Sequence, residues 1–161
     1  MKRITQMTLV LVIGLAIVYT IFSTMTQQQA LAKDVTVQSL TGEVQMLAIK
    51  DQVILNFWAT YCPPCDREMP ALNAAYPLLQ AKSVQLYAIN VEEPTRIVNQ
   101  YIKGKNLNFP ILLDRSGKLK DAYAITTLPT TLFIQNGEVM HTVKGEITEA
   151  ELNDLTKKYF D

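Results

Sequence analysis

Residues 56–66 read N-F-W-A-T-Y-C-P-P-C-D and contain the only two cysteines of the chain, Cys62 and Cys65. The start of this segment belongs to the nearly unbroken apolar run 53–59. Such a run is typical of a strand that is buried on both faces. The following segment, 63–82, carries apolar residues at helical spacing. We therefore expect Cys62 to lie where a buried strand ends and a helix begins.

The position of Cys62 favours a chemical role over a structural one. The N-terminus of a helix gathers unpaired N–H groups and partial positive charge, and this field stabilises a thiolate. Cys65 follows one turn later, within bonding reach and in a more buried position. Pro63 and Pro64 contribute no N–H and suit the first turn of a helix. The pattern predicts thiol–disulfide exchange, in which Cys62 attacks and Cys65 releases the partner.

Other roles fit the two cysteines less well. A purely structural disulfide would close a loop of only two residues and would remove little entropy from the unfolded chain. A zinc site needs about four ligands, whereas the chain offers Cys62, Cys65 and one histidine, His141, which we expect to be a solvated strand residue. A thiol peroxidase stays open but has no further support. No metal is expected, and without a haem, flavin or nicotinamide motif no cofactor is expected.

Length and charge limit the remaining function classes. The 161 residues suggest one domain plus an additional segment. Fifteen basic residues balance fifteen acidic ones, so nothing indicates a nucleic acid as the main partner.

The amino-terminal segment predicts a membrane anchor. Residues 7–25 carry no charge and, as a helix, would span close to the ~30 Å of bilayer hydrocarbon. Lys2 and Arg3 precede this run, which places the N-terminus in the cytoplasm and the remainder outside. Cleavage after Ala32 is the alternative, because Ala30-Leu31-Ala32 matches a signal-peptide site. We thus expect three parts: residues 1–25 form a cytoplasmic start and a transmembrane signal-anchor, residues 26–34 form a tether, and residues 35–161 form the catalytic domain.

The rest of the sequence predicts an α/β domain. Thr41-Gly42 and Asn136-Gly137 each mark a hairpin turn. Alternation of strands and helices between these turns indicates parallel crossovers, so a mixed central sheet with helices on both faces follows. Pro70 and Pro77 should bend or break the first helix. The expected strands are 35–39, 43–47, 53–59, 84–91, 109–113, 130–135 and 138–144, and the expected helices are 63–82, 94–104, 117–123 and one capped by Thr148 with Glu151.

A family resemblance rests on three segments. W-A-T-Y-C-P-P-C at 58–65 resembles the active-site segment of the thioredoxin superfamily. The motifs D-R-E-M-P at 66–70 and N-F-P-I-L-L-D at 108–114, together with the anchor, make the chain similar to the TlpA/ResA type of membrane-tethered extracytoplasmic thiol–disulfide oxidoreductases. The resemblance covers about 35–159 and implies a thioredoxin-like fold.

The resemblance also implies a set of site residues. The segment Thr127-Leu128-Pro129-Thr130 matches the place where this fold holds a cis proline facing the cysteines, although sequence alone favours a trans proline. Leu128 would then offer backbone groups to the partner's chain. The residues expected to shape the site or bind substrate are Trp58, Tyr61, Pro63, Pro64, Thr127, Leu128 and Pro129.

Two positions leave the acid–base chemistry open. Glu93 falls in an insertion typical of the subgroup, where some members carry an active-site glutamate, and is a candidate acid–base residue. The alternative is an ordinary acidic residue in the first turn of a helix. Asn56 stands where thioredoxin has a buried aspartate that helps to move the proton of the second cysteine, so the proton path of Cys65 is undetermined.

The resemblance finally implies partners. Pro64 before Cys65 matches reducing thioredoxins, so we expect a reductant of oxidised exported proteins, including the haem-binding cysteines of apocytochrome c. A membrane thiol-electron donor would recharge it, and residues 7–25 would contact the lipid bilayer. The alternatives are an oxidase or isomerase of the same fold, or a non-catalytic or metal-carrying binding module.

Overall fold

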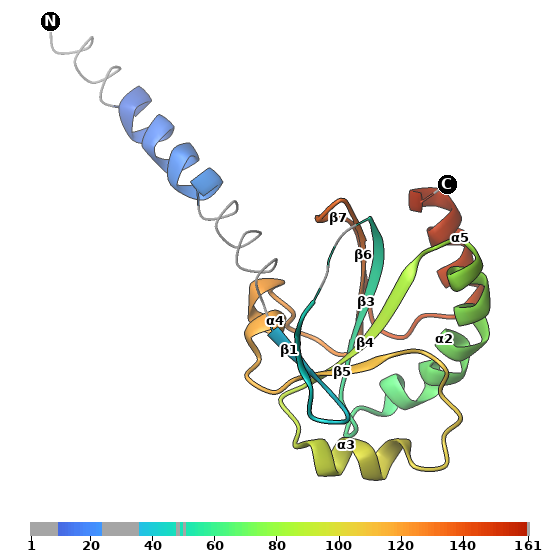
Figure 1. The fold of residues 1–161 in the computed structure, drawn as a ribbon. Coiled ribbons are helices and arrows are strands. Elements are labelled where there is room, and N and C mark those ends of the chain that lie inside the picture. The colour runs from blue at the N-terminus through green and yellow to red at the C-terminus, as the bar shows by residue number, and fades with distance from the viewer. Residues whose placement is uncertain (1–9, 24–35, 48, 50, 161) are drawn as a thin grey trace, which may run out of the picture.

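A seven-stranded mixed sheet in the order β2-β1-β5-β4-β3-β6-β7 organises the described residues, which are 10–23, 36–47, 49 and 51–160 of the computed structural model (Figure 1). The strands are β1 (Thr36–Ser39), β2 (Val44–Met46), β3 (Gln52–Trp58), β4 (Gln85–Val91), β5 (Ile111–Asp114), β6 (Thr130–Gln135) and β7 (Glu138–Lys144). The helices are α2 (Pro63–Ala81), α3 (Thr95–Ile102), α4 (Lys118–Ala122), α5 (Glu149–Phe160) and a preceding helix over 10–23.

The centre of the sheet is parallel and its margins are antiparallel. Strand β4 runs parallel to β3 and to β5, whereas β1, β6 and β7 pair antiparallel to their neighbours. The register places Trp58 opposite Asn90 and Val91 opposite Asp114. The carboxyl ends of the three parallel strands therefore meet at one edge of the sheet, where ligand sites of open α/β sheets form.

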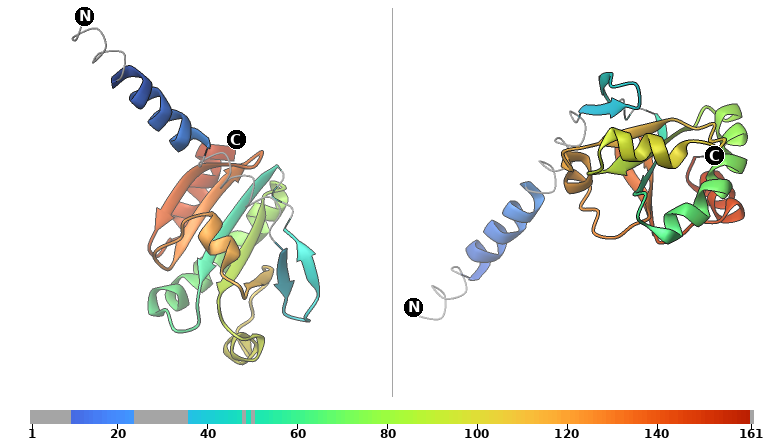
Figure 2. Two further views of the ribbon diagram at one scale, coloured as in Figure 1. Left: turned by 90° about the vertical axis from the view of Figure 1, so that its left-hand side faces the viewer. Right: turned by 90° about the horizontal axis from the view of Figure 1, so that it is seen from below.

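Helices cover both faces of the sheet, as predicted. Helices α2 and α5 contact each other on one face, and α4 lies on the opposite face (Figures 1 and 2). Helix α3 lies at the carboxyl end of β4, close to the start of α2 (Figure 1). Strands β3, β4 and β5 follow one another in one direction across the sheet, so their two right-handed crossovers lie on one face, whereas the return connection from β5 to β6 carries α4 across the other face.

The core fixes the end of β3. Trp58 and Phe57 are fully buried between the two helical layers, and α2 adds Met69, Leu72 and Leu79 from one stripe. Burial of each such side chain stabilises the fold by roughly 1.5–3 kcal/mol. The loop that follows β3 thus starts from a rigid strand.

The expected break of α2 at its internal prolines does not occur. The helix continues from Pro63 to Ala81 through Pro70 and Pro77, so neither proline breaks it. Each internal proline removes a backbone hydrogen bond, but the apolar stripe of this helix is buried against the sheet and α5. Packing of that stripe offsets the local cost.

The anchor prediction lies only partly within the described residues. Residues 10–23 are helical, while both ends of the predicted span 7–25 and the predicted tether 26–34 lie outside the described residues. Among the described residues, no helix has both the length and the hydropathy needed to cross a membrane.

Two left-handed residues meet where β4 and β5 end. Gly117 has φ 70° and Glu92 has φ 58°. A Cβ atom added to Gly117 would lie 2.6 Å from Oε1 of Glu92, whose other oxygen binds Nζ of Lys120 at 2.8 Å. Gly117 is therefore favoured by its backbone conformation, whereas the flexible end of Glu92 could move away from a larger residue.

We expect Gly117→Ala to lower the free energy of unfolding by about 1 kcal/mol, because an L-residue is strained at this positive φ while the exposed end of Glu92 can move aside. Gly104→Ala is the matched control, because Gly104 has φ 84° and open space around its Cβ position, so strain alone should cost about 1 kcal/mol there. Urea unfolding of the purified protein measures both values, and a much larger loss for Gly117→Ala than for Gly104→Ala would contradict strain as the common cause.

Candidate active site

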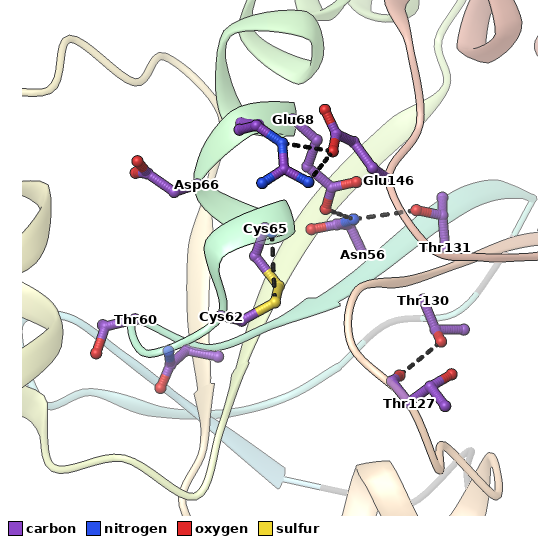
Figure 3. The surroundings of a disulfide bond; sticks show 12 residues. Asn56, Thr60, Cys62, Cys65, Asp66, Glu68, Thr127, Thr130, Thr131 and Glu146 are labelled. Carbon is purple, nitrogen blue, oxygen red and sulfur yellow. Dashed lines mark hydrogen bonds and ion pairs between the residues drawn. A yellow bond between two sulfur atoms is a disulfide. The ribbon is translucent and has the colours of Figure 1, made fainter.

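The two cysteines form a disulfide at the start of α2. The sulfur atoms are 2.10 Å apart and the Cα atoms 5.3 Å apart (Figure 3). Cys65 is 0% exposed and Cys62 is 7% exposed. Of the two residues only Cys62 reaches the surface, and its role as the attacking sulfur stays a prediction.

The first turn of α2 directs its field at the sulfur of Cys62. Cys62 is the N-cap residue, and the backbone N–H of Cys65 donates to its Sγ atom at 3.3 Å. Pro63 and Pro64 occupy the first two helical positions, as predicted, and offer no N–H. The donor of Cys65 and the helix dipole together stabilise a negative charge on this sulfur when the disulfide opens.

A groove of about 460 Å³ runs beside Cys62. The peptide bond between Leu128 and Pro129 is cis, as predicted. Tyr61 is 70% exposed and forms an aromatic wall. Of the residues predicted to shape the site, those that line the groove are Tyr61, Pro63, Pro64, Thr127 and Leu128.

Trp58 and Pro129 lie behind this lining. Trp58 is fully buried, and its ring packs against Tyr101 of α3 at 5.2 Å between centroids. The carbonyl of Pro129 accepts a hydrogen bond from the N–H of Gly145 at 2.9 Å. Both residues are therefore buried and do not line the groove.

Glu93 holds the loop that leads to Cys62. Its buried carboxylate accepts hydrogen bonds from the backbone N–H of Thr60 at 2.7 Å, from the Thr60 hydroxyl and from Nδ2 of Asn90 at 2.7 Å. Helix α3 begins only at Thr95 and has no acidic residue in its first turn, so the alternative interpretation of Glu93 as such a residue is wrong. The carboxylate joins the end of β4 to the segment before the nucleophile.

Sequence reasoning missed a buried carboxyl group beside Cys65. Nδ2 of Asn56 donates to Oε1 of Glu68 at 2.8 Å and to Oγ1 of Thr131 at 3.0 Å (Figure 3). The backbone N–H of Ile147 donates to Oε2 of Glu68 at 3.1 Å. Burial raises the pKa of Glu68 to about 7, although these hydrogen bonds oppose the shift.

The sequence carried a signal for this carboxyl group. Glu68 follows Cys65 by three residues, so both lie on the same face of α2, next to the buried Met69. An acidic residue on the apolar stripe of a helix is unusual because a buried charge is costly. Asn56 thus contacts a carboxyl group that α2 supplies.

The histidine takes no part in this site. His141 is half-buried on β7, and its ring stacks on Tyr159 of α5 with centroids 5.0 Å apart. It is therefore more enclosed than predicted. Within the part of the chain that the structure describes, no group of three His, Cys, Asp or Glu side chains is placed to hold a metal ion.

The raised pKa of Glu68 makes stability depend on pH. The folded protein holds this proton more tightly than the unfolded chain, whose glutamate titrates near 4.5. The contribution of this proton to the free energy of unfolding is fully present below about pH 4.5 and is lost as the pH rises through about 7. The total loss is about 3 kcal/mol. Glu68→Gln should remove this slope.

The measurement is urea unfolding of the oxidised protein between pH 4.5 and 7.5. We expect the stability of wild type relative to Glu68→Gln to fall as the pH rises. Glu138→Gln, at an exposed position on β7, is the control and should keep the wild-type slope. A parallel pH dependence of wild type and Glu68→Gln would contradict the raised pKa.

Comparison with known proteins agrees with this geometry. The pattern of the AhpC/TSA family matches residues 28–142. The thiol-disulfide oxidoreductase ResA of Halalkalibacterium halodurans is 34% identical over 159 residues, which cover 93% of this chain and 90% of the relative. ResA of Geobacillus kaustophilus is 35% identical over 161 residues, covering 94% and 92%.

A solved structure shares the fold. The crystal structure of StoA from Bacillus subtilis has a TM-score of 0.67 and 32% identity, and the match covers 76% of this chain and 95% of that one. The α/β architecture described above is therefore thioredoxin-like. The chain belongs to the AhpC/TSA family and is a thiol–disulfide oxidoreductase homologous to ResA, with Cys62 and Cys65 as its CxxC pair.

Proposed function

We propose that this oxidoreductase works as a reductant of disulfides in exported client proteins. The observation that carries the proposal is the asymmetry of the pair: Cys62 lines the groove at the N-cap of α2 and is 7% exposed, whereas Cys65 is fully buried and lies outside the groove lining. An accessible thiolate suits attack on a protein disulfide, and a shielded second thiol suits intramolecular release. Proline at position 64 supports the reducing direction.

The reaction begins with the reduced pair. The thiolate of Cys62 attacks one sulfur of the client disulfide, and the other client sulfur leaves as a thiolate that takes up a proton. The Cys65 thiolate then attacks Cys62, which breaks the mixed disulfide and releases the second client sulfur. The client gains two electrons and two protons, and the pair is left as the disulfide.

Glu68 is proposed as the group that accepts the proton of Cys65. It lies one helical turn after Cys65 on the same face, in a site closed to water. A carboxyl group with a pKa of about 7 exchanges protons readily at neutral pH. Asn56 holds this carboxyl group through its amide and takes no proton itself.

The groove beside Cys62 is proposed as the client site. Its walls combine an exposed aromatic ring, Tyr61, with the backbone of Thr127 and Leu128. An extended client segment placed there would bring its disulfide to the accessible sulfur. Apocytochrome c with oxidised haem-binding cysteines is the proposed client, and a membrane thiol-electron carrier is the proposed donor.

The membrane attachment is likewise a proposal. Every side chain from 10 to 23 is exposed, including Val10, Tyr19 and Phe22 at about 70%. A helix that is apolar on all sides needs an apolar environment. We assign this role to residues 7–25, with the catalytic domain outside the cytoplasm.

Trapping in cells tests the client proposal. In Cys65→Ser the second step is blocked, so we expect a mixed disulfide between Cys62 and an exported protein, released by dithiothreitol and identified by mass spectrometry. Cys62→Ser is the matched control and should capture nothing. No captured protein, or a reduction potential near −120 mV as in strong oxidants, would contradict a client reductant.

The anchor proposal predicts an uncleaved chain in the membrane fraction. Ile13→Lys with Val18→Lys should release the protein, because a charge at a helix centre costs about 2.5–3.5 kcal/mol in the membrane. Ile13→Leu with Val18→Leu is the control and should stay bound. A mature protein whose N-terminus begins at Lys33 would instead show cleavage after Ala32.

A further inference from the structure

The carboxylate of Asp66 is held by the end of α3. Asp66 directly follows Cys65 in the first turn of α2, and its backbone N–H donates to the carbonyl of Cys62 at 3.2 Å. Its Oδ1 atom accepts a hydrogen bond from the Tyr101 hydroxyl and pairs with Nζ of Lys105 at 2.6 Å. Figure 3 shows the carboxylate turned away from the disulfide. The mechanism above uses none of these three side chains.

The same end of α3 also contacts the strand that leads to the nucleophile. The ring of Tyr101 packs on Trp58, the last residue of β3, with centroids 5.2 Å apart. Nζ of Lys105 lies 4.4 Å from the centre of the Tyr101 ring. Tyr101 therefore joins the residues before and after the cysteine pair, and Lys105 is held beside them.

The charge of Asp66 works against the nucleophile. A carboxylate in the first turn of a helix interacts favourably with the helix dipole. The thiolate of Cys62 relies on the same positive field, and a second negative charge one turn away disfavours it. The hydrogen bonds from Lys105 and Tyr101 hold the pKa of Asp66 below its usual value, so Asp66 remains charged.

Lys105 supplies the opposing charge. Its ammonium group lies on the Asp66 carboxylate, and its side chain is 36% exposed. Burial raises the pKa of Tyr101, with a further contribution from Asp66, so its hydroxyl keeps the proton that it donates. Asp66, Lys105 and Tyr101 together form a cluster with no net charge. The carboxylate, which alone would oppose the thiolate, is thereby neutralised.

We propose that Lys105 and Tyr101 are positioning residues that neutralise Asp66 and thereby set how strongly the reduced pair stabilises the Cys62 thiolate. Asp66 lowers the stability of the thiolate, and Lys105, placed by Asp66 and Tyr101, restores it. Helix α3 thus tunes the redox poise of the pair without contacting either sulfur. The proposal rests on dithiol chemistry and holds for either direction of net electron flow.

Other charged groups also surround the pair. Glu92 and Lys120 line the groove with Cys62 as an ion pair, Glu93 binds the Thr60 loop, and Glu68 lies on the Cys65 side. None of them contacts Asp66 or Lys105 through an interaction found among the described residues. These groups are unchanged in every variant below, so their electrostatic effect on the Cys62 thiolate is the same in all of them.

The test measures two properties of the full chain: the pH midpoint of Cys62 alkylation in the reduced protein and the equilibrium constant with glutathione. Lys105→Gln should raise the midpoint and make the pair more reducing by about threefold, or about 14 mV at 29.6 mV per tenfold change. Asp66→Asn should shift both quantities in the opposite direction by a similar factor. Tyr101→Phe keeps the ring on Trp58 and should follow Lys105→Gln with a smaller change.

Three controls separate charge from structure. Lys158→Gln removes a lysine that lies 5.1 Å from the ring of Tyr159 on α5, far from the site, and should change neither quantity. In the Asp66→Asn background, Lys105 loses the partner that holds it, so Lys105→Gln should have little further effect. At 1 M salt the single-variant shifts should shrink, because the screening length falls to about 3 Å.

Shifts of the same sign in Asp66→Asn and Lys105→Gln would show that the cluster acts only by holding the fold, and would overturn the proposal. Unchanged midpoints would overturn it as well. The absolute potential of wild type tests the reducing direction separately, so a failure of the client-reductant proposal is distinguishable from a failure of this one.

Discussion

The chemistry of this protein depends on one backbone constraint, which is that the N-terminus of α2 stays directly behind the sulfur of Cys62. The helix field falls off within a turn, so a small displacement of the loop before Cys62 would remove it. Burial of Trp58 fixes one end of that loop and the hydrogen bonds from Thr60 to Glu93 fix its middle. The nucleophile is therefore positioned by groups that lie outside the lining of the groove.

The same constraint explains why two identical side chains have different roles. Cys62 precedes the helix and reaches the groove, whereas Cys65 is inside the first turn and faces the core. A thiol in a dry site resists ionisation. It needs a local proton acceptor, and the buried carboxyl group of Glu68 is the group of that kind that α2 places on the same face.

Most of the fold followed from local patterns, whereas part of the site did not. The strands β3, β4 and β5 are buried on both faces and read as apolar runs, and both hairpins have turn sequences that only a few conformations fit. The resemblance located the cysteines and the cis proline. Glu68 was missed because its burial depends on Asn56, Thr131 and Ile147, which come from distant parts of the chain. The continuity of α2 through Pro70 has a similar cause, since tertiary packing outweighed a local penalty.

Two carboxyl groups within one turn of α2 show how the fold assigns these roles. Asp66 and Glu68 are two residues apart and so lie on nearly opposite sides of the helix. Asp66 is half exposed and kept ionised by Lys105, whereas Glu68 is buried and holds its proton up to about neutral pH. The two side chains are both carboxylic acids, and only their surroundings differ. One therefore adjusts the charge around the attacking sulfur, and the other is suited to receive the proton of the resolving thiol.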